Sequence, residues 1–302
     1  MPVTDSGNNS PMFDLISQRL FAVPPRETLY HYTTLSGLLG IVDSAELRCS
    51  DIRYMNDSTE LRHTLDLLGE QVTQRIVAGV DKPALLTAFL DWLTYRVVSG
   101  PMLFCASFRG NGNLLSQWRG YSVHGKGVSL GFEPEHILDC ARRQNFEVGR
   151  CVYAPSQQEQ MIDEIIDAVE ALAEDSDAGD ESVSQNKQWV RRFQTIEGDL
   201  LRIAAVLKHP AFEEEQEWRV VSPMIGAAAS GRVQFREGNS MLIPWFPLDL
   251  RDQQGRLAIE HAFLGPTSNI DLSMNSLALY LQSRGASPRR DITYCDIPYR
   301  KR

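Results

Sequence analysis

The sequence lacks the features that mark several common kinds of site. Its five cysteines lie far apart and include no Cys-x-x-Cys pair, which argues against a disulfide framework and a cysteine zinc site. It also has no His-x-x-x-His spacing, no Gly-rich phosphate loop of the Walker type and no apolar run long enough to span a membrane. We therefore expect a cytoplasmic protein that binds no metal and does not enter a membrane.

Basic side chains are few relative to acidic ones. Thirty lysines and arginines stand against 39 aspartates and glutamates, which gives a formal net charge of -9. General binding of nucleic acid is not expected, because such a charge repels phosphate at long range. Apolar residues make up 43% of the 302 residues, so the chain can bury a large core and fold without disulfides.

Two apolar, aromatic runs without proline mark the middle of the chain. They are Phe104–Phe108 and Val128–Phe132, and both are typical of strands. Apolar residues between them recur at helical spacing, which predicts a loop followed by one short helix. That helix would place Trp118, Arg119 and Tyr121 at the mouth of a sheet, where ligand sites are common. The alternative is that the two aromatic residues belong to the core.

A strand is also predicted near the N-terminus, where the run LYHYT alternates from Leu29 onward. The alternation puts His31 on one face of the strand and Tyr30 and Tyr32 on the other. A histidine in a strand most often makes a structural hydrogen bond. A functional role for His31 therefore needs support from other parts of the chain.

A second group of polar residues lies in the run FEEEQEWRVV that begins at Phe212. As a strand, this run would place Glu215, Glu217 and Arg219 on one face. Neighbouring carboxylates repel each other unless a cation or a ligand separates them. The pattern therefore indicates either a site for a hydroxyl-bearing ligand or a charged strand that faces solvent. Glu217 lies deeper in the apolar part of the run and is expected to be the more tightly held carboxylate.

Amphipathic helices are predicted elsewhere from apolar residues at three- and four-residue spacings. Residues 157–181 contain ten acidic side chains and no Lys or Arg, which predicts a helix with an acidic outer face. The apolar stripe is lost near residue 174, so a mobile acidic loop is expected from there to about residue 187. Three further helices are expected at Pro11–Val23, Pro83–Val98 and Trp189–Lys208.

Several ordered blocks of the sequence resemble the bacterial domain-of-unknown-function family 2971. The resemblance spans almost the whole chain and implies one α+β domain over residues 29–302, with a mixed or split central sheet flanked by helices. Residues 1–28 would form an N-terminal tail and helix. The blocks are LYHYT at Leu29, MNDSTEL at Met55, CASF at Cys105, LSQWRGYSVHGKGVSLGF at Leu115, EEQEWR at Glu214, GP at Gly265 and IPYR at Ile297.

A weaker similarity concerns chemistry. A histidine on an early strand, a central aromatic residue and a late glutamate resemble the His-Tyr-Glu arrangement of ADP-ribosyltransferases, including DNA-modifying toxins. The similarity implies an ADP-ribosyltransferase-like fold and NAD as co-substrate, with His31 on the nicotinamide ribose. Tyr121 or Trp118 would stack on the nicotinamide ring, and Glu217 or Glu215 would hold the ribose 2′-hydroxyl.

The expected catalytic set is therefore His31, Tyr121 and Glu217. Arginine offers paired donors to phosphate oxygens, so Arg53, Arg119 and Arg219 are expected at the pyrophosphate. The full set of expected ligand contacts is Tyr32, Arg53, Ser107, Trp118, Arg119, Glu215 and Arg219.

Three functions from different classes remain open at this stage. The first is an NAD-dependent ADP-ribosyltransferase that modifies an unidentified macromolecule in bacterial conflict or phage defence. The second is a nuclease-like hydrolase that uses His31 with Glu217 or Glu60 as acid and base. The third is a non-catalytic sensor or adaptor that binds a nucleotide or a partner protein through its aromatic and arginine residues.

Overall fold

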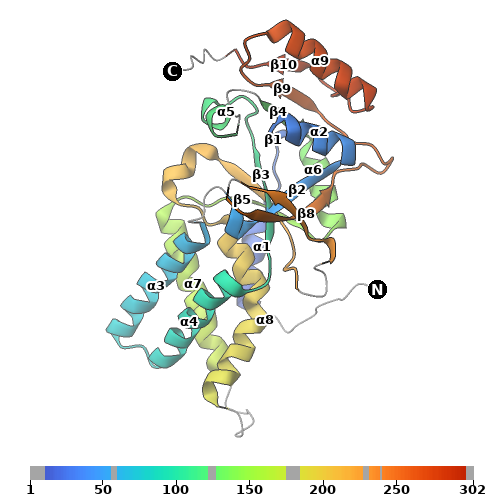
Figure 1. The fold of residues 1–302 in the computed structure, drawn as a ribbon. Coiled ribbons are helices and arrows are strands. Elements are labelled where there is room, and N and C mark those ends of the chain that lie inside the picture. Colours follow the sequence, from blue (N-terminus) through green and yellow to red (C-terminus); the bar gives the residue numbers. More distant parts are fainter. Residues whose placement is uncertain are drawn as a thin grey trace.

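The structure is a computed structural model that describes residues 11–55, 60–121, 127–174, 184–226, 231–238 and 240–296. In this part of the chain a ten-stranded mixed sheet has helices on both of its faces (Figure 1). The strands are β1 (Leu29–Thr34), β2 (Glu46–Asp51), β3 (Phe104–Arg109), β4 (Gly127–Phe132), β5 (Glu147–Arg150), β6 (Glu217–Val221), β7 (Gln234–Glu237), β8 (Leu242–Asp249), β9 (His261–Leu264) and β10 (Ile292–Tyr294). The α-helices are α1 (Pro11–Phe21), α2 (Leu35–Ser44), α3 (Glu60–Ala78), α4 (Pro83–Ser99), α5 (Leu115–Tyr121), α6 (Pro134–Arg143), α7 (Pro155–Glu174), α8 (Gln185–Val206) and α9 (Ile270–Ser283), with 3-10 turns η1 (Ile52–Tyr54) and η3 (Pro210–Glu215).

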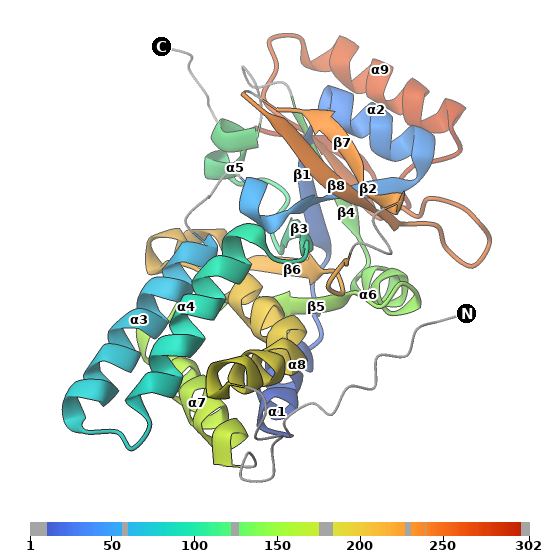
Figure 2. The same cartoon turned by 60° about the horizontal axis from the view of Figure 1, so that its bottom comes forward.

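β3 is the strand around which the sheet divides. One of its edges pairs with β6 over the whole run from Cys105 to Arg109. Its other edge is shared, because β2 pairs at Cys105 and β1 pairs at Arg109. β1 and β2 therefore diverge and leave Ala106–Phe108 unpaired on that edge, a stretch that we call the split. From it extend a first arm, β1-β4-β9-β10, and a second arm, β2-β8-β7 (Figure 2).

The connection between β1 and β2 explains why both reach the same edge. Each strand runs antiparallel to β3, so the two are parallel to each other and need a crossover helix, which is α2. The Thr34 side chain caps α2 by accepting a hydrogen bond from the Gly37 N–H. The helix stops at Ala45, whose left-handed backbone (φ 54°) turns the chain directly into β2.

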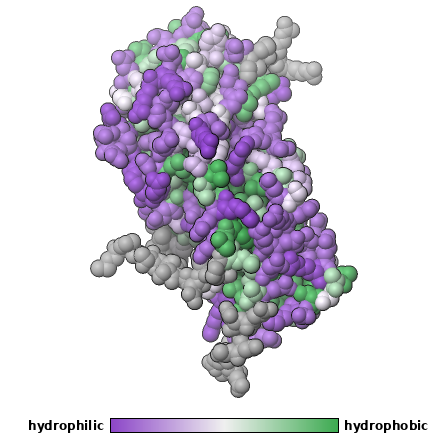
Figure 3. Space-filling view, turned by 180° about the vertical axis from the view of Figure 1, so that it is seen from behind, coloured by the Kyte–Doolittle hydropathy of each residue, from purple (hydrophilic) through white to green (hydrophobic). Residues whose placement is uncertain are grey.

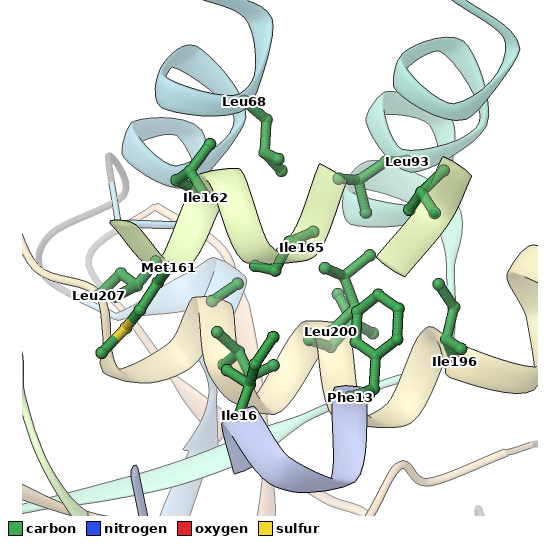
Figure 4. Packing of buried hydrophobic residues seen from close by; sticks show 14 of the residues in the cluster. Phe13, Ile16, Leu68, Leu93, Met161, Ile162, Ile165, Ile196, Leu200 and Leu207 are labelled. Atoms are coloured by element: carbon green, nitrogen blue, oxygen red, sulfur yellow. The ribbon is translucent and has the colours of Figure 1, made fainter. Parts of the chain in front are cut away.

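The two faces of β3 look into different cores. Cys105 packs into a core formed with α1, α3, α4, α7 and α8, whose apolar residues interlock in Figure 4. Phe104, Ala106 and Phe108 point the other way, into a core shared with α2, α6 and α9. We call these the bundle face and the opposite face of the sheet. Arg109 lies four positions after Cys105 on the same strand, so its side chain also points to the bundle face.

The surface is hydrophilic over much of the side shown in Figure 3, and hydrophobic side chains gather near the middle of that view. Exposed large apolar residues also occur on the edge hairpin of the second arm, where Phe235 is 63% exposed and Leu242 is 66% exposed. Among the helices that the structure describes, none is long and apolar enough to cross a membrane.

The predicted fold class is confirmed, because the structure has a single mixed, split sheet flanked by helices. Two local predictions were wrong. β2 was not predicted as a strand, and α8 already begins at Gln185, inside the expected acidic loop. Residues 175–183 of that loop lie outside the described residues.

The core under the bundle face should be sensitive to lost volume. The Phe89 ring on α4 is fully buried, with ring centroids of Trp92 at 6.1 Å and Phe193 at 5.3 Å. We expect Phe89→Ala to lower the free energy of unfolding by about 3–5 kcal/mol. The substitution leaves a cavity, and the packed side chains around it cannot move enough to fill it. Urea unfolding monitored by circular dichroism measures it. Val98→Ala is the control on the same helix, at a side chain 71% exposed, and an equal loss there would contradict the argument.

Candidate functional site

The split holds the first candidate residue. The His31 Nδ1 atom lies 3.0 Å from the Ser107 carbonyl oxygen, which belongs to the part of β3 that neither β1 nor β2 pairs with. Ser107 is the only residue of β3 that is partly exposed, and His31 is partly exposed as well. The imidazole thus satisfies a backbone acceptor that strand pairing leaves open, at a point that solvent reaches.

Three effects set the protonation of His31. Burial of the ring lowers its pKa below the ordinary value, the hydrogen bond to Ser107 opposes this shift, and the charge of Arg109 adds to the lowering. The ring is therefore neutral near pH 7. A carbonyl can only accept a hydrogen bond, so Nδ1 carries the proton and Nε2 is left as an acceptor.

The strand register separates His31 from the predicted glutamate. Tyr30 pairs with Arg109, and Arg109 pairs with Glu217, so these three side chains leave the bundle face of the sheet. His31 follows Tyr30 and therefore leaves the opposite face, where its ring lies 5.7 Å from that of Phe108. The predicted catalytic pair of His31 and Glu217 thus starts from opposite faces.

Glu217 belongs to a compact ion cluster on the bundle face. Its carboxylate lies 2.7 Å from Lys208 Nζ and 3.0 Å from Arg219 Nε. Arg109 is 3.5 Å from Glu217 and 2.6 Å from Glu215, and Lys208 is 2.6 Å from Glu215. We use the name ion cluster for Arg109, Lys208, Glu215, Glu217 and Arg219.

Apart from Glu215, the members of the cluster are almost completely removed from water. Side-chain exposure is 1% for Glu217, 0% for Arg219 and 3% for Arg109. Burial alone would raise the pKa of the Glu217 carboxyl, but the charges of Arg219, Arg109 and Lys208 hold it well below its usual range. Glu217 is therefore an ionised carboxylate whose partners are all within the protein.

The prediction that Glu215 lies on the same strand as Glu217 was wrong. Glu215 ends the 3-10 turn η3, and β6 begins only at Glu217. Gln216 between them has a left-handed backbone (φ 43°), which breaks the alternation on which the prediction depended. Glu215 reaches the cluster from this turn and keeps a side-chain exposure of 22%.

Trp118 and Tyr32 form an aromatic support under α5. Their ring centroids are 4.8 Å apart in an edge-to-face arrangement, and both residues are buried. The Trp118 indole N–H donates to Asn113 Oδ1, at 2.9 Å. The Tyr32 hydroxyl donates to the Asn111 carbonyl and accepts from the Leu114 N–H, both at 2.8 Å. These contacts hold the loop before α5, so the reading of Trp118 as a core aromatic is the one that its surroundings favour.

Arg53 is likewise engaged inside the protein. Its Nη2 lies 2.6 Å from Asp51 Oδ2 and its Nε lies 2.9 Å from Asp51 Oδ1. A third nitrogen, Nη1, donates to the Val98 carbonyl at 3.2 Å. Because Asp51 is fully buried, Arg53 compensates a carboxylate that would otherwise be costly to bury.

The other two predicted residues lie on α5. Arg119 is exposed on this helix. Tyr121 is its last residue, and the Tyr121 side chain lies outside the described residues. The predicted stacking of Tyr121 on a nicotinamide ring thus stays a prediction.

A cavity of about 360 Å³ lies elsewhere, beside α6 and the loop before β9. None of the predicted site residues lines it, and its walls carry both signs of charge. They include Glu133, His136, Asp139, Arg143, Asp252, Glu260 and Arg289. Within the described ranges no group of three or more His, Cys, Asp or Glu side chains is placed to hold a metal ion.

Two members of the ion cluster were not anticipated. Arg109 immediately follows the predicted strand Phe104–Phe108, and Lys208 lies at the end of a predicted helix. Neither position carries a local signal, because the contact between Arg109 and Glu215 joins residues 106 positions apart. Only the pairing of β3 with β6 brings them together.

One comparison with known proteins gives a match. The model of the family described as "Protein of unknown function (DUF2971)" matches residues 117–220, which include most of α5 and most of β6. The resemblance to this family is thus confirmed for that part of the chain. No curated protein and no solved structure gives a significant match, so the similarity to ADP-ribosyltransferases stays a prediction.

The ion cluster generates a stability prediction. Glu217→Gln removes the charge that balances three buried or nearly buried cations, and we expect it to lower the free energy of unfolding by about 3–5 kcal/mol. Glu214→Gln, an exposed neighbour, should change it by less than about 0.5 kcal/mol. Urea unfolding at pH 7 compares the two variants with the parent.

The parent and Glu217→Gln also test the lowered pKa of the Glu217 carboxyl. A depressed carboxyl pKa stabilises the folded state above the unfolded-state value of about 4.5, and this contribution is lost as the pH falls toward the folded-state pKa. The stability gap between the parent and Glu217→Gln should therefore narrow in acid. A gap that is equally wide at pH 7 and near pH 3 would show that Glu217 is not held ionised by its neighbours.

Proposed function

We propose that the chain binds an NAD-like nucleotide at the split, and that this binding serves ADP-ribosyl transfer to a macromolecule. The observation that carries the proposal is the bond from His31 Nδ1 to the Ser107 carbonyl, at 3.0 Å, in the split of the sheet. It fixes a neutral imidazole, on a residue that is partly exposed, with Nε2 as the acceptor atom of the ring. A ribose hydroxyl is a suitable donor for that atom.

The transfer chemistry also needs a carboxylate. Breaking the bond between nicotinamide and ribose develops positive charge on the ribose, and a nearby carboxylate stabilises that charge. Glu217 is enclosed by cations, whereas Glu215 keeps 22% of its side chain exposed. We therefore assign this role to Glu215 in place of Glu217. Glu215 lies on the bundle face and His31 on the opposite face, so the nucleotide would extend through the split, where the Arg109 backbone pairs with Tyr30 and the Arg109 guanidinium binds Glu215.

One observation favours the sensor as a second candidate. Most predicted ligand-binding cations are neutralised within the protein, namely Arg53 by Asp51 and Arg219 by Glu217. Such groups can shape a nucleotide site without taking part in a reaction. The sensor and the transferase share the binding step and differ only in turnover.

The test separates binding from turnover. Calorimetric titration with NAD measures the dissociation constant for the parent, His31→Gln and His136→Gln. Glutamine can still donate to Ser107 but loses the placed ring acceptor, so we expect at least ~10-fold weaker binding for His31→Gln. His136 is the matched control, because its Nε2 also bonds a backbone carbonyl (Leu250, 2.9 Å) but on α6, outside the split.

Turnover is followed as label transfer from NAD to cellular protein and nucleic acid. We expect Glu215→Gln to bind NAD and to transfer at most about a hundredth of the label that the parent transfers. Binding without transfer by the parent would support the sensor and remove the transferase. Absence of NAD binding, or equal binding by His31→Gln and the parent, would overturn the proposal.

A further inference from the structure

The second arm of the sheet carries two arginines on the bundle face. In the register of β2 with β8, Arg48 pairs with Pro247 and Ser50 pairs with Trp245. In the register of β7 with β8, Arg236 pairs with Ile243. On β8, positions 243, 245 and 247 alternate with residues that point into the core on the opposite face. Arg48 and Arg236, which pair with this set of positions, therefore share the bundle face, with Trp245 between them.

Arg48 is exposed and Arg236 is half-buried, and both lack the carboxylate partner found at Arg53 and Arg219. Within the described residues, neither guanidinium lies within ion-pair distance of a carboxylate, although the chain has more acidic than basic side chains. The pKa of Arg236 is lowered, first by burial and then by the charge of Arg48. Two guanidinium groups that repel each other at one place are stabilised when an anion lies between them.

The floor between the arginines is also suited to a ligand. The Arg48 guanidinium carbon lies over the Trp245 ring, 5.0 Å from its centroid, at the distance of a cation–π contact. Arg236 Nη2 donates to Ser50 Oγ at 3.3 Å, so the Ser50 hydroxyl can donate onward. The indole N–H of Trp245, a residue only 6% exposed, finds no hydrogen-bond partner among the described residues.

The register also places this pair beside the split. Ser50 pairs with Cys105, the residue of β3 that comes just before the split. Arg48 lies two positions earlier on the same face of β2, where the second arm leaves β3. His31 approaches the split from the first arm and from the opposite face, so a ligand held by both His31 and the arginine pair extends through the split from one face of the sheet to the other.

We propose that Arg48 and Arg236, with Ser50, form the binding site for the pyrophosphate of the nucleotide. The assignment rests on the proposed function for the identity of the ligand, whereas the affinity for a pyrophosphate group follows from the arginine pair itself. Planar guanidinium groups bind phosphate oxygens through paired N–H donors. Arg53 and Arg219, which were expected to bind the pyrophosphate, bind carboxylates instead. We therefore assign the pyrophosphate contacts to Arg48 and Arg236.

The experiment uses three small-molecule probes and a single-stranded oligonucleotide in calorimetric titrations of the full chain at one fixed, low salt concentration. Inorganic pyrophosphate tests the arginine pair alone, ADP-ribose tests the pair together with His31, and nicotinamide riboside lacks the pyrophosphate. Arg48→Gln and Arg236→Gln are compared with Arg142→Gln, which removes an arginine of 74% side-chain exposure on α6. Arg48→Lys keeps the charge without the planar pair of donors, and thermal unfolding confirms that each variant is folded.

We expect the parent to bind pyrophosphate and ADP-ribose. Arg48→Gln and Arg236→Gln should each bind both at least ~10-fold more weakly, Arg48→Lys should be intermediate, and Arg142→Gln should match the parent. Absence of pyrophosphate binding by the parent, or unchanged binding by both Gln variants, would overturn the arginine site. A single-stranded oligonucleotide that binds more tightly than ADP-ribose would overturn the small nucleotide as its ligand.

The two proposals fail in different ways. His31→Gln should bind inorganic pyrophosphate like the parent and ADP-ribose more weakly. If it binds both like the parent while Arg48→Gln loses both, the arginine site stands and the role of His31 in the proposed function fails. If His31→Gln loses ADP-ribose while the arginine variants lose neither probe, the arginine site fails and the role of His31 stands.

Discussion

The pairing of β3 with three strands is the constraint on which the rest of the structure depends. β6 occupies one edge of β3 completely, so β1 and β2 must share the other edge and diverge. Their divergence leaves the carbonyl of Ser107 without a strand partner, and the ring of His31 supplies the missing hydrogen bond. A backbone acceptor that strand pairing leaves open needs another hydrogen-bond partner. The position of His31 is thus tied to the topology of the sheet.

Charge is distributed unevenly over the bundle face. We call β3, β5 and β6 the trunk of the sheet. There, under α8, cations and carboxylates of the ion cluster balance one another closely, and the Arg219 guanidinium also donates to the Ala205 carbonyl of that helix. On the second arm, Arg48 and Arg236 have no such balance among the described residues. Buried ion pairs are expensive to form and expensive to break, whereas unbalanced cations near solvent attract anions. The first arrangement stabilises the trunk, and the second favours ligand binding.

The sequence predicted the elements whose signal is local. The aromatic runs of β3 and β4 and the alternation of β1 were sufficient to place those strands. β2 was missed because Arg48 and Ser50 interrupt its apolar residues and because its partner β8 is almost two hundred positions away. The role of Glu215 was misjudged for a different reason: the left-handed backbone of Gln216 is not visible in the residue types.

The candidate site was predictable only in part, because proximity in the sheet is not encoded locally. His31, Glu215 and Glu217 were singled out from their surroundings in the sequence, but their faces depend on the register of β1, β3 and β6. Trp118 has the residue type of a stacking platform, yet its contacts with Tyr32 and Asn113 use it as a support for a loop. Residue type indicated which side chains matter, and pairing decided what each one can reach.

The shared edge of β3 also has a consequence for the order of folding. β1, α2 and β2 are synthesised before β3, and β6 follows more than a hundred residues after it. Until β3 arrives, β1 and β2 expose edges that could pair with other chains, and the trunk cannot close before β6 is made. The helices α3, α4, α7 and α8 have more local contacts and can form earlier. The trunk that carries the ion cluster is thus completed late, when the parts it joins are already present.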